Sequence, residues 1–388
     1  MTGAKGRRWP AEAVMQRDSE TGASIRRLTG CLAHSQHLYF TNPGYYDGGK
    51  KLLFGSHRGG SPNLFGMELE SGSMVQLTDL SPPAELPFHQ LACLNPAGTE
   101  AYFWHGQKLI ALDLRTLEER GLYEQEKEWG IGLTNCTADG RFVCVAAVHD
   151  PQGVMAGMYN GYAGFREFFQ SHPLSRVLAI ATDGSGARVV HEDGTWIGHA
   201  NTSPRLPNIL TICHEGPWDL VDQRIWGLDI STGRTWKIRP SGPGELAGHE
   251  YWLADGVTIG YHGGIPQGAV FGFADWEGRM FREFVVDARD SWHFHSRDDV
   301  LVVGDGSAKD PYLLLWRIRE GKAEGPRRLC WHRSSFHTHL SHCHPAVTPD
   351  GKSVLYTSDD LGYSNIYLAE IPAFESLPEK GTRGEQLF

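Results

Sequence analysis

The chain alternates short apolar runs with turn-forming residues, and this pattern recurs along almost its whole length. Most units open on an Asp-Gly or Asn-Pro-x-Gly turn, followed by strand-like runs separated by a further Gly-containing turn. A helical period is almost absent, so the pattern predicts antiparallel strands joined by tight turns rather than helices. The units begin at Asp47, Asn95, Asp139, Pro207, Asp255, Asp298 and Asp350.

The spacing of these seven units indicates a propeller. It is close to the roughly 40–45 residues of one propeller blade, so we predict an all-β, seven-bladed β-propeller with residues 1–388 as a single domain. The last unit ends after 365–372 without a fourth strand, whereas 21–30 resembles the strand at 71–78 that closes the first unit. We therefore expect the N-terminal segment 21–30 to close the last blade, which removes sheet edges that invite aggregation.

One segment departs from the repeat. Residues 154–173 form an insertion in the third unit, and it contains a candidate short helix at 165–170. Inserted segments on a rigid scaffold often carry binding residues. We expect this insertion to lie over one face of the disc and to shape a binding site there.

Composition narrows the class of protein. The 388 residues are 40% hydrophobic and 21% charged, as in an ordinary globular protein, and the net charge of -10 argues against nucleic-acid binding. No export signal or membrane-length apolar run is visible, and the seven cysteines contain no C-x-x-C pair. We therefore expect reduced thiols, a cytoplasmic location and no membrane partner. An acidic substrate would need local Arg, His or metal to attract it.

A histidine-rich stretch precedes the last strand-like unit. Its sequence, FHTHLSHCHPAVTP, contains four histidines, at positions 337, 339, 342 and 344. In an extended backbone His342 and His344 point to one face, and Cys343 between them points to the other. Imidazole is the commonest protein ligand for transition metals, so four histidines so close together favour a metal site over a solvated loop.

Three further polar segments interrupt the strands, and they contribute Arg224, His249 and His293. The sequence distances from His249 to His293 and from His293 to His342 are each about the length of one blade, which predicts a shared site around the axis. Each histidine alone could equally cap a turn. Clustered imidazoles without thiolates suit Mn, Zn, Ni or Fe as a Lewis acid, an arginine suits a carboxylate, and a separate histidine suits a general base. The chain has neither G-x-S-x-G nor H-E-x-x-H, the motifs of serine hydrolases and zinc proteases.

With these segments taken together, the chain resembles the oligogalacturonate lyases, a family of manganese-dependent seven-bladed propeller polysaccharide lyases. The resemblance spans nearly the whole chain, and CHEGPWDLVD is its most specific motif. The other carriers are GHEYW (248–252), the H-F-H-S…VGDG block (293–306), H-x-x-H-C-H-P (339–345), GGKKLLFGS, DGTWIGH (193–199) and TPDGKSVLYTSD.

The resemblance implies an enzyme of pectin degradation that cleaves short oligogalacturonides, mainly disaccharides, inside the cell by β-elimination. It implies His249 as the base, Arg224 as the active-site arginine, and a divalent metal, Mn²⁺ in the first place. The implied metal ligands are His293, His339, His342 and His344. The family pattern has Gln where this chain has His339 and Pro where it has Cys343, and an additional imidazole would favour Zn²⁺, Ni²⁺ or Fe²⁺.

The expected chemistry places the metal on the C6 carboxylate of a uronate while His249 removes the C5 proton. His199 and His214 are candidates for sugar contacts or for orienting the metal ligands, and structural hydrogen bonding is the alternative role for both. Two other functions stay open: a lyase or epimerase acting on a different uronide, and a non-catalytic propeller that binds a sugar or a protein. The sequence leaves the oligomeric state undetermined.

Overall fold

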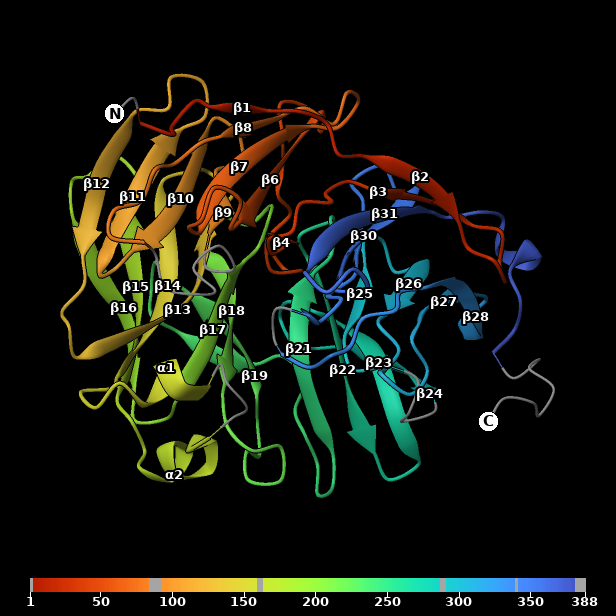
Figure 1. Ribbon diagram of the computed structural model, residues 1–388. Helices are drawn as coiled ribbons and strands as arrows, with labels where there is room; N and C mark the ends of the chain where they lie inside the picture. Colours follow the sequence, from red (N-terminus) through yellow and green to blue (C-terminus); the bar gives the residue numbers. More distant parts are fainter. Residues whose placement is uncertain (1–2, 84–91, 159–162, 287–290, 339–340, 381–388) are drawn as a thin grey trace.

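Seven antiparallel sheets follow one another around a common centre in the computed structural model of the protein (Figure 1). The structure describes residues 3–83, 92–158, 163–286, 291–338 and 341–380. Each sheet corresponds to one repeat of the sequence, which confirms the predicted all-β, seven-bladed propeller. No helix among the described residues is long and apolar enough to cross a membrane.

The strands of the first four blades are as follows. Blade 1 contains β1 (Arg8–Trp9), β4 (Ser35–His37), β5 (Tyr45–Tyr46), β6 (Lys51–Ser56), β7 (Asn63–Glu68) and β8 (Met74–Gln76). Blade 2 contains β9 (Cys93–Leu94), β10 (Glu100–His105), β11 (Lys108–Asp113) and β12 (Glu119–Glu124). Blade 3 contains β13 (Trp129–Cys136), β14 (Phe142–His149), β15 (Ser175–Ala181) and β16 (Ala187–Asp193). Blade 4 contains β17 (Ile197–Thr202), β18 (Ile209–His214), β19 (Ile225–Asp229) and β20 (Thr235–Lys237).

The remaining three blades complete the ring. Blade 5 contains β21 (Leu246–Trp252), β22 (Thr258–Ile265), β23 (Gly268–Asp275) and β24 (Phe281–Val286). Blade 6 contains β25 (Phe294–Ser296), β26 (Leu301–Gly304), β27 (Tyr312–Arg319) and β28 (Lys322–Trp331). Blade 7 contains β2 (Val14–Arg17), β3 (Ser24–Arg27), β29 (Ala346–Val347), β30 (Ser353–Ser358) and β31 (Asn365–Glu370), and a short 3-10 helix at Phe374–Ser376 follows it.

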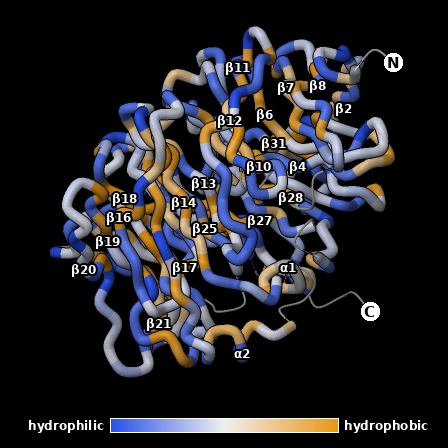
Figure 2. Tube along the Cα trace, turned by 90° about the vertical axis from the view of Figure 1, so that its left-hand side faces the viewer, coloured by the Kyte–Doolittle hydropathy of each residue, from blue (hydrophilic) through white to orange (hydrophobic). Residues whose placement is uncertain are grey.

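The hydrophobic core lies between the faces of neighbouring blades. One cluster joins Cys144 and Val177 of blade 3 to Ile197 and Ile212 of blade 4, all of them buried. Figure 2 shows hydrophobic residues along strands such as β14 and β17 and hydrophilic residues in many of the connecting turns. Because each blade packs between two neighbours, middle strands such as β14 and β30 are buried on both faces, which explains their continuous apolar runs.

The N-terminal segment closes the ring. Strand β3 pairs with β31, with Ile25 opposite Ala369 and Arg27 opposite Tyr367, and β2 adds an outer strand to the same sheet. The predicted closure of the last blade by an N-terminal strand is therefore confirmed. Strand β1 continues onto the outer edge of blade 1 by pairing with β8, so one segment covers the edges of two adjacent blades.

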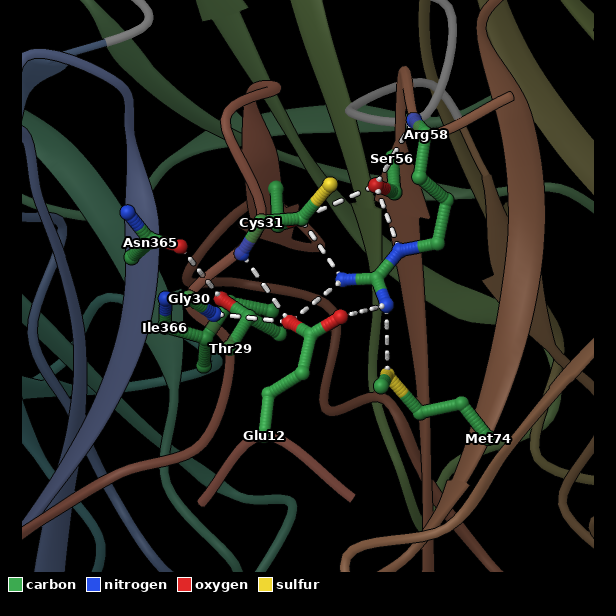
Figure 3. A network of polar contacts seen from close by, with 10 residues as sticks. Glu12, Thr29, Gly30, Cys31, Ser56, Arg58, Met74, Asn365 and Ile366 are labelled. Atoms are coloured by element: carbon green, nitrogen blue, oxygen red, sulfur yellow. Dashed lines mark hydrogen bonds and ion pairs between the residues drawn. The ribbon is translucent and has the colours of Figure 1, made fainter. Parts of the chain in front are cut away.

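A buried ion pair holds this closure together (Figure 3). The guanidinium of Arg58 donates to the Glu12 carboxylate at 2.9 Å, and the Arg58 side chain has 0% exposure. The other carboxylate oxygen of Glu12 accepts the backbone N–H groups of Gly30 at 2.7 Å and Cys31 at 3.0 Å. One carboxylate thus binds the N-terminal segment to blade 1 beside its junction with blade 7.

The insertion in blade 3 forms two short helices, α1 (Val154–Met158) and α2 (Phe165–Gln170). Residues 159–162 of the insertion lie outside the described residues. Phe168 of α2 packs edge-on against Trp196 with ring centroids 5.0 Å apart, and Arg166 pairs with Asp219 at 3.1 Å. The insertion therefore lies against the loops at the start of blade 4 and between β18 and β19.

Candidate active site

Five histidines from successive blades lie close together at one end of the central channel. The ring centroid of His293 is 4.6 Å from that of His249 and 4.6 Å from that of His344. Tyr39 links His199 to this group, because its ring lies 6.1 Å from His199 and 5.2 Å from His344. His342 is the fifth member, with its ring centroid 6.1 Å from that of His293. Each histidine lies on, or just before, the first strand of its blade.

Three of these imidazoles form a group that fits one metal ion. Ring nitrogens of His293, His342 and His344 all lie within 4.8 Å of one another. Nitrogen ligands about 2.1 Å from one ion lie up to roughly 4.2 Å apart, so small side-chain rotations bring the three together. His339, predicted as a fourth ligand, lies outside the described residues. His337 is exposed and does not belong to the group.

Asp305 fixes the orientation of His293. Its Oδ2 lies 3.0 Å from His293 Nδ1, while its Oδ1 accepts the backbone N–H groups of Trp292 and His293 at 2.8 and 2.9 Å. Asp305 is fully buried, and burial raises its pKa to about 6. With Nδ1–H donated to the carboxylate, the lone pair of the His293 ring lies on Nε2, as in the usual carboxylate–histidine–metal arrangement.

His249 lies in a β-bulge of β21. The pairing shifts between Gly248, opposite His262, and Tyr251, opposite Gly260. The extra residue places His249 at a φ of +51°, and His344 likewise has a φ of +41°. Such left-handed conformations are costly for residues other than glycine and cluster at functional sites. The bulge turns the His249 ring onto the His293 ring, with an interplanar angle of 16°.

The surroundings of His249 keep its ring neutral. Its Nδ1 lies 3.3 Å from the carbonyl oxygen of Trp292 and 2.6 Å from Nε2 of His262. A carbonyl can only accept, so in the tautomer that donates Nδ1–H to Trp292 the lone pair of the ring lies on Nε2. Burial and then the charge of Arg224 lower the pKa of His249 to about 4, so the ring is neutral at neutral pH.

Arg224 is held in a buried cluster just before β19. Its Nη2 donates to Glu215 at 2.7 Å, and its Nη1 donates to the carbonyl of Gly216 at 2.8 Å. Burial alone would raise the pKa of Glu215, but the Arg224 charge outweighs it and lowers that pKa to about 2. The Arg224 Nε is buried beside Gly248 without a hydrogen-bond partner among the described residues.

A second group of possible ligand atoms lies around this arginine. His199, Cys213 and Glu215 also bring one donor atom each within 4.8 Å of one another. Arg224 already donates to Glu215 and, at 3.5 Å, to the Cys213 sulfur, so a cation is present among these atoms. Burial raises the pKa of Cys213 well above its ordinary value, which keeps the thiol neutral. We therefore interpret this group as an arginine site rather than a metal site.

The two predicted sugar-contact histidines lie on opposite faces of blade 4. His199 pairs with Cys213 across β17 and β18 and lies on the side of Arg224. His214 follows Cys213 and points the other way, with its Nε2 at 3.6 Å from Asp193 and its ring 5.1 Å from that of Trp226. The structure thus brings His199, but not His214, together with the remaining candidates.

Sequence reasoning missed four residues of the site: Asp305, His262, Trp218 and Trp292. The guanidinium carbon of Arg224 lies 4.9 Å from the ring centroid of Trp218. Trp292 lies beside His249 and is 50% exposed. Asp305 carried a weak signal, since it is an acid directly after the apolar run of β26. The others depend on contacts between blades that no local pattern contains.

Comparisons with known proteins agree along the whole chain. The family model described as oligogalacturonate lyase matches residues 3–375. An oligogalacturonide lyase of Pectobacterium atrosepticum is 27% identical over 391 residues, which cover 95% of this chain and 98% of that protein. A solved structure of an oligogalacturonate lyase in complex with manganese superposes with a TM-score of 0.86 at 28% identity, covering 95% of this chain and 98% of that one. The solved oligogalacturonate lyase of Vibrio parahaemolyticus gives a TM-score of 0.84 at 28% identity, covering 95% and 99% of the two chains.

Proposed function

The chain belongs to the oligogalacturonate lyase family, whose members are carbon–oxygen lyases, and on this premise we propose that it cleaves short oligogalacturonides by metal-dependent β-elimination. Digalacturonate-like fragments of pectin are the proposed substrates. The observation that carries the proposal is one geometry: three imidazoles with nitrogens within 4.8 Å of one another, and a fourth, neutral imidazole stacked 4.6 Å from one of them. The three clustered imidazoles are the proposed metal ligands, and the fourth, adjacent imidazole is the proposed base.

His293, His342 and His344 would hold the metal, and His339 is the proposed fourth ligand. Mn²⁺ is the first choice, supported by the manganese-bound relative, and Zn²⁺, Ni²⁺ or Fe²⁺ are alternatives because the donors are imidazoles. When bound, such an ion supplies Lewis-acid stabilisation of negative charge on the C6 carboxylate of the uronate. Asp305 keeps the His293 ring in the tautomer that this role requires.

His249 is the proposed base. Its neutral Nε2 takes the proton from C5, the electrons of the C5–H bond form a double bond between C4 and C5, and the C4–O bond breaks. The departing oxygen takes a proton from solvent, and the product carries a 4,5-unsaturated uronate. A base with a depressed pKa is present in its proton-accepting form across the neutral range.

Arg224 and the aromatic residues are proposed to bind the substrate. Arg224 is the proposed cationic partner of a uronate carboxylate, while Glu215 and Gly216 keep its guanidinium in place. Trp292 presents a half-exposed indole beside His249 and Trp218, where a sugar ring can lie on it. His199 is the proposed polar contact from blade 4. His214 faces away from this group, so we give it a structural role.

The test is an assay on digalacturonate with metal-loaded protein. Cleavage should produce the ultraviolet absorbance of a 4,5-unsaturated uronate, and chelation should abolish it. The His249→Ala variant should lose at least 100-fold in kcat, the usual scale of general-base catalysis, whereas His337→Ala at an exposed position should match the wild type. If the metal-loaded protein forms no unsaturated product from galacturonides, the proposal is wrong. A parallel panel of glucuronides and rhamnose-linked uronates tests the alternative substrates.

A further inference from the structure

A large cavity occupies the channel at the end opposite the histidine group. Its volume is about 490 Å³, within the roughly 300–1,000 Å³ range of small-molecule sites. It is lined by the later parts of the inner strands and the residues that follow them, such as Asn201 after His199 and Ala346 after His344. Arg224, His249, His293, His342 and His344 do not line it. The cavity is therefore separate from the site described above.

Tyr39 and Phe40 separate the two ends of the channel. Both residues line the cavity. Their rings also contact the histidine group, with Tyr39 5.2 Å from His344 and Phe40 5.6 Å from His293. Because these side chains fill the space between the two regions, a molecule in the cavity and a substrate at the histidines can be bound at the same time.

The charge of the cavity lining is opposite to that of the whole protein. The chain has 46 acidic and 36 basic residues, yet among the described residues the lining contains Arg205 and Arg297 and no Asp or Glu. His37 and His295 also line the cavity, and burial lowers the pKa of both. The two arginines are therefore the cationic side chains of the described lining, and such groups favour an anion.

Both arginines form a hydrogen bond with Ala254. Arg205 Nε donates to the carbonyl of Ala254 at 3.4 Å, and the Ala254 N–H donates to the carbonyl of Arg297 at 2.9 Å. Arg205 of blade 4, through its side chain, and Arg297 of blade 6, through its backbone carbonyl, thus both contact Ala254 of blade 5. Arg297 has one partly exposed contact with Asp298 at 3.8 Å, a type of pair that contributes little. Planar guanidinium groups are suited to bidentate binding of a carboxylate.

We propose that this cavity is a second binding site, in which Arg205 and Arg297 bind the carboxylate of a small hydroxylated acid. Its identification as a monomeric uronate, the kind of product that short galacturonides yield, rests on the proposed function. Binding of the anion itself rests only on the cavity and its two arginines.

Titration calorimetry and crystal soaking with D-galacturonate test the proposal in the metal-loaded protein. Soaked crystals should show the sugar acid at Arg205 and Arg297. The double variant Arg205→Gln/Arg297→Gln should weaken this binding event at least tenfold while digalacturonate cleavage stays as in the wild type. Neutral D-galactose, which lacks the carboxylate, should not bind in the cavity.

Arg319→Gln provides the matched control, because Arg319 is an exposed arginine at the far end of β27. It should leave D-galacturonate binding unchanged, and the unfolding midpoints of all variants should coincide. Equal affinity in the wild type and the double variant, or equal binding of D-galactose in the cavity, would overturn the proposal. If D-galacturonate binds at the arginines but digalacturonate is not cleaved, the proposed function fails while the anion site stands.

Discussion

At the scale of single residues, the site depends on side chains that touch no substrate. Asp305 is fully buried, and its two oxygens are divided between His293 Nδ1 and two backbone N–H groups. This arrangement fixes both the ring and the backbone of one proposed metal ligand. Glu215 has the same relation to Arg224, since its carboxylate holds the guanidinium at 2.7 Å. Both acids position a functional group and keep its protonation state defined.

Asp305→Asn should lower metal affinity by about 10- to 100-fold, the typical effect of losing the partner of a ligating histidine. The amide can still accept the backbone N–H groups, so the fold should persist, but it no longer offers a negative charge to His293. Competitive titration with a metal indicator measures the change. Asp298→Asn, at an exposed acid in the turn before β26, is the control. Unchanged metal affinity in Asp305→Asn would contradict the role that we assign to the carboxylate.

The Arg224–Glu215 pair predicts a pH-dependent contribution to stability. The folded-state pKa of Glu215 is lowered to about 2, so its contribution is fully present above the unfolded pKa, near 4.3, and is lost as pH falls from there through about 2. A shift of this size corresponds to at most about 3 kcal/mol.

Glu215→Gln should therefore reduce the free energy of unfolding at pH 7 by up to about 3 kcal/mol. The difference from the wild type should shrink as the pH falls below about 4.3. Urea unfolding at several pH values measures this trend. Glu192→Gln, in the exposed pair with Arg176, should show no comparable pH dependence. A difference that stays constant from pH 7 to pH 3 would rule out the ion pair as its cause.

At the scale of elements, the ion pair of Glu12 with the buried Arg58 adds to the strand pairing that holds the N-terminal segment. Removing the carboxylate of Glu12 leaves Arg58, with 0% side-chain exposure, as an uncompensated buried charge. Breaking such a pair from one side costs about 3–5 kcal/mol. Glu12→Ala should lower the free energy of unfolding by about this amount in equilibrium denaturation. Glu119→Ala breaks the Lys5–Glu119 pair, which is more exposed than the Glu12–Arg58 pair, and should cost less than about 1 kcal/mol. Equal effects in the two variants would disprove the special role of Glu12.

The elements also show what the sequence could predict and what it could not. The blades and the closing strand follow from local signals: turn residues, short apolar runs and the likeness of 21–30 to 71–78. The histidines could be assigned to neighbouring positions around the axis because blade period converts sequence spacing into position around it. The sequence did not show which side of blade 4 His214 faces. Cys213 and His214 point to opposite sides of β18, and only the pairing register shows which of them faces Arg224. Asp305 gave only the weak signal of an acid after an apolar run, and His262 gains its role from its contact with His249, which no local pattern contains.

At the scale of the whole molecule, closure of the ring is what brings the site together. The proposed ligands His342 and His344 lie in blade 7, and His293 lies in blade 6. Tyr39, which contacts both His199 and His344, follows β4 of blade 1. The first and last blades therefore both contribute to one end of the channel. A ring that opens between them separates Tyr39 from His344.

Two truncations separate closure of the ring from simple loss of chain. Deleting residues through Ala11 removes only β1, so blade 7 keeps β2 and β3 and the protein should stay monodisperse and active. Deleting residues through Gly30 also removes β2 and β3 and leaves β31 as an unpaired edge. Exposed strand edges pair with other chains, so this variant should form soluble oligomers or aggregates and lose activity. Light scattering coupled to size-exclusion chromatography measures the first effect, and cleavage of digalacturonate measures the second. A monodisperse, active protein that lacks β3 would show that the other six blades hold the ring closed without it.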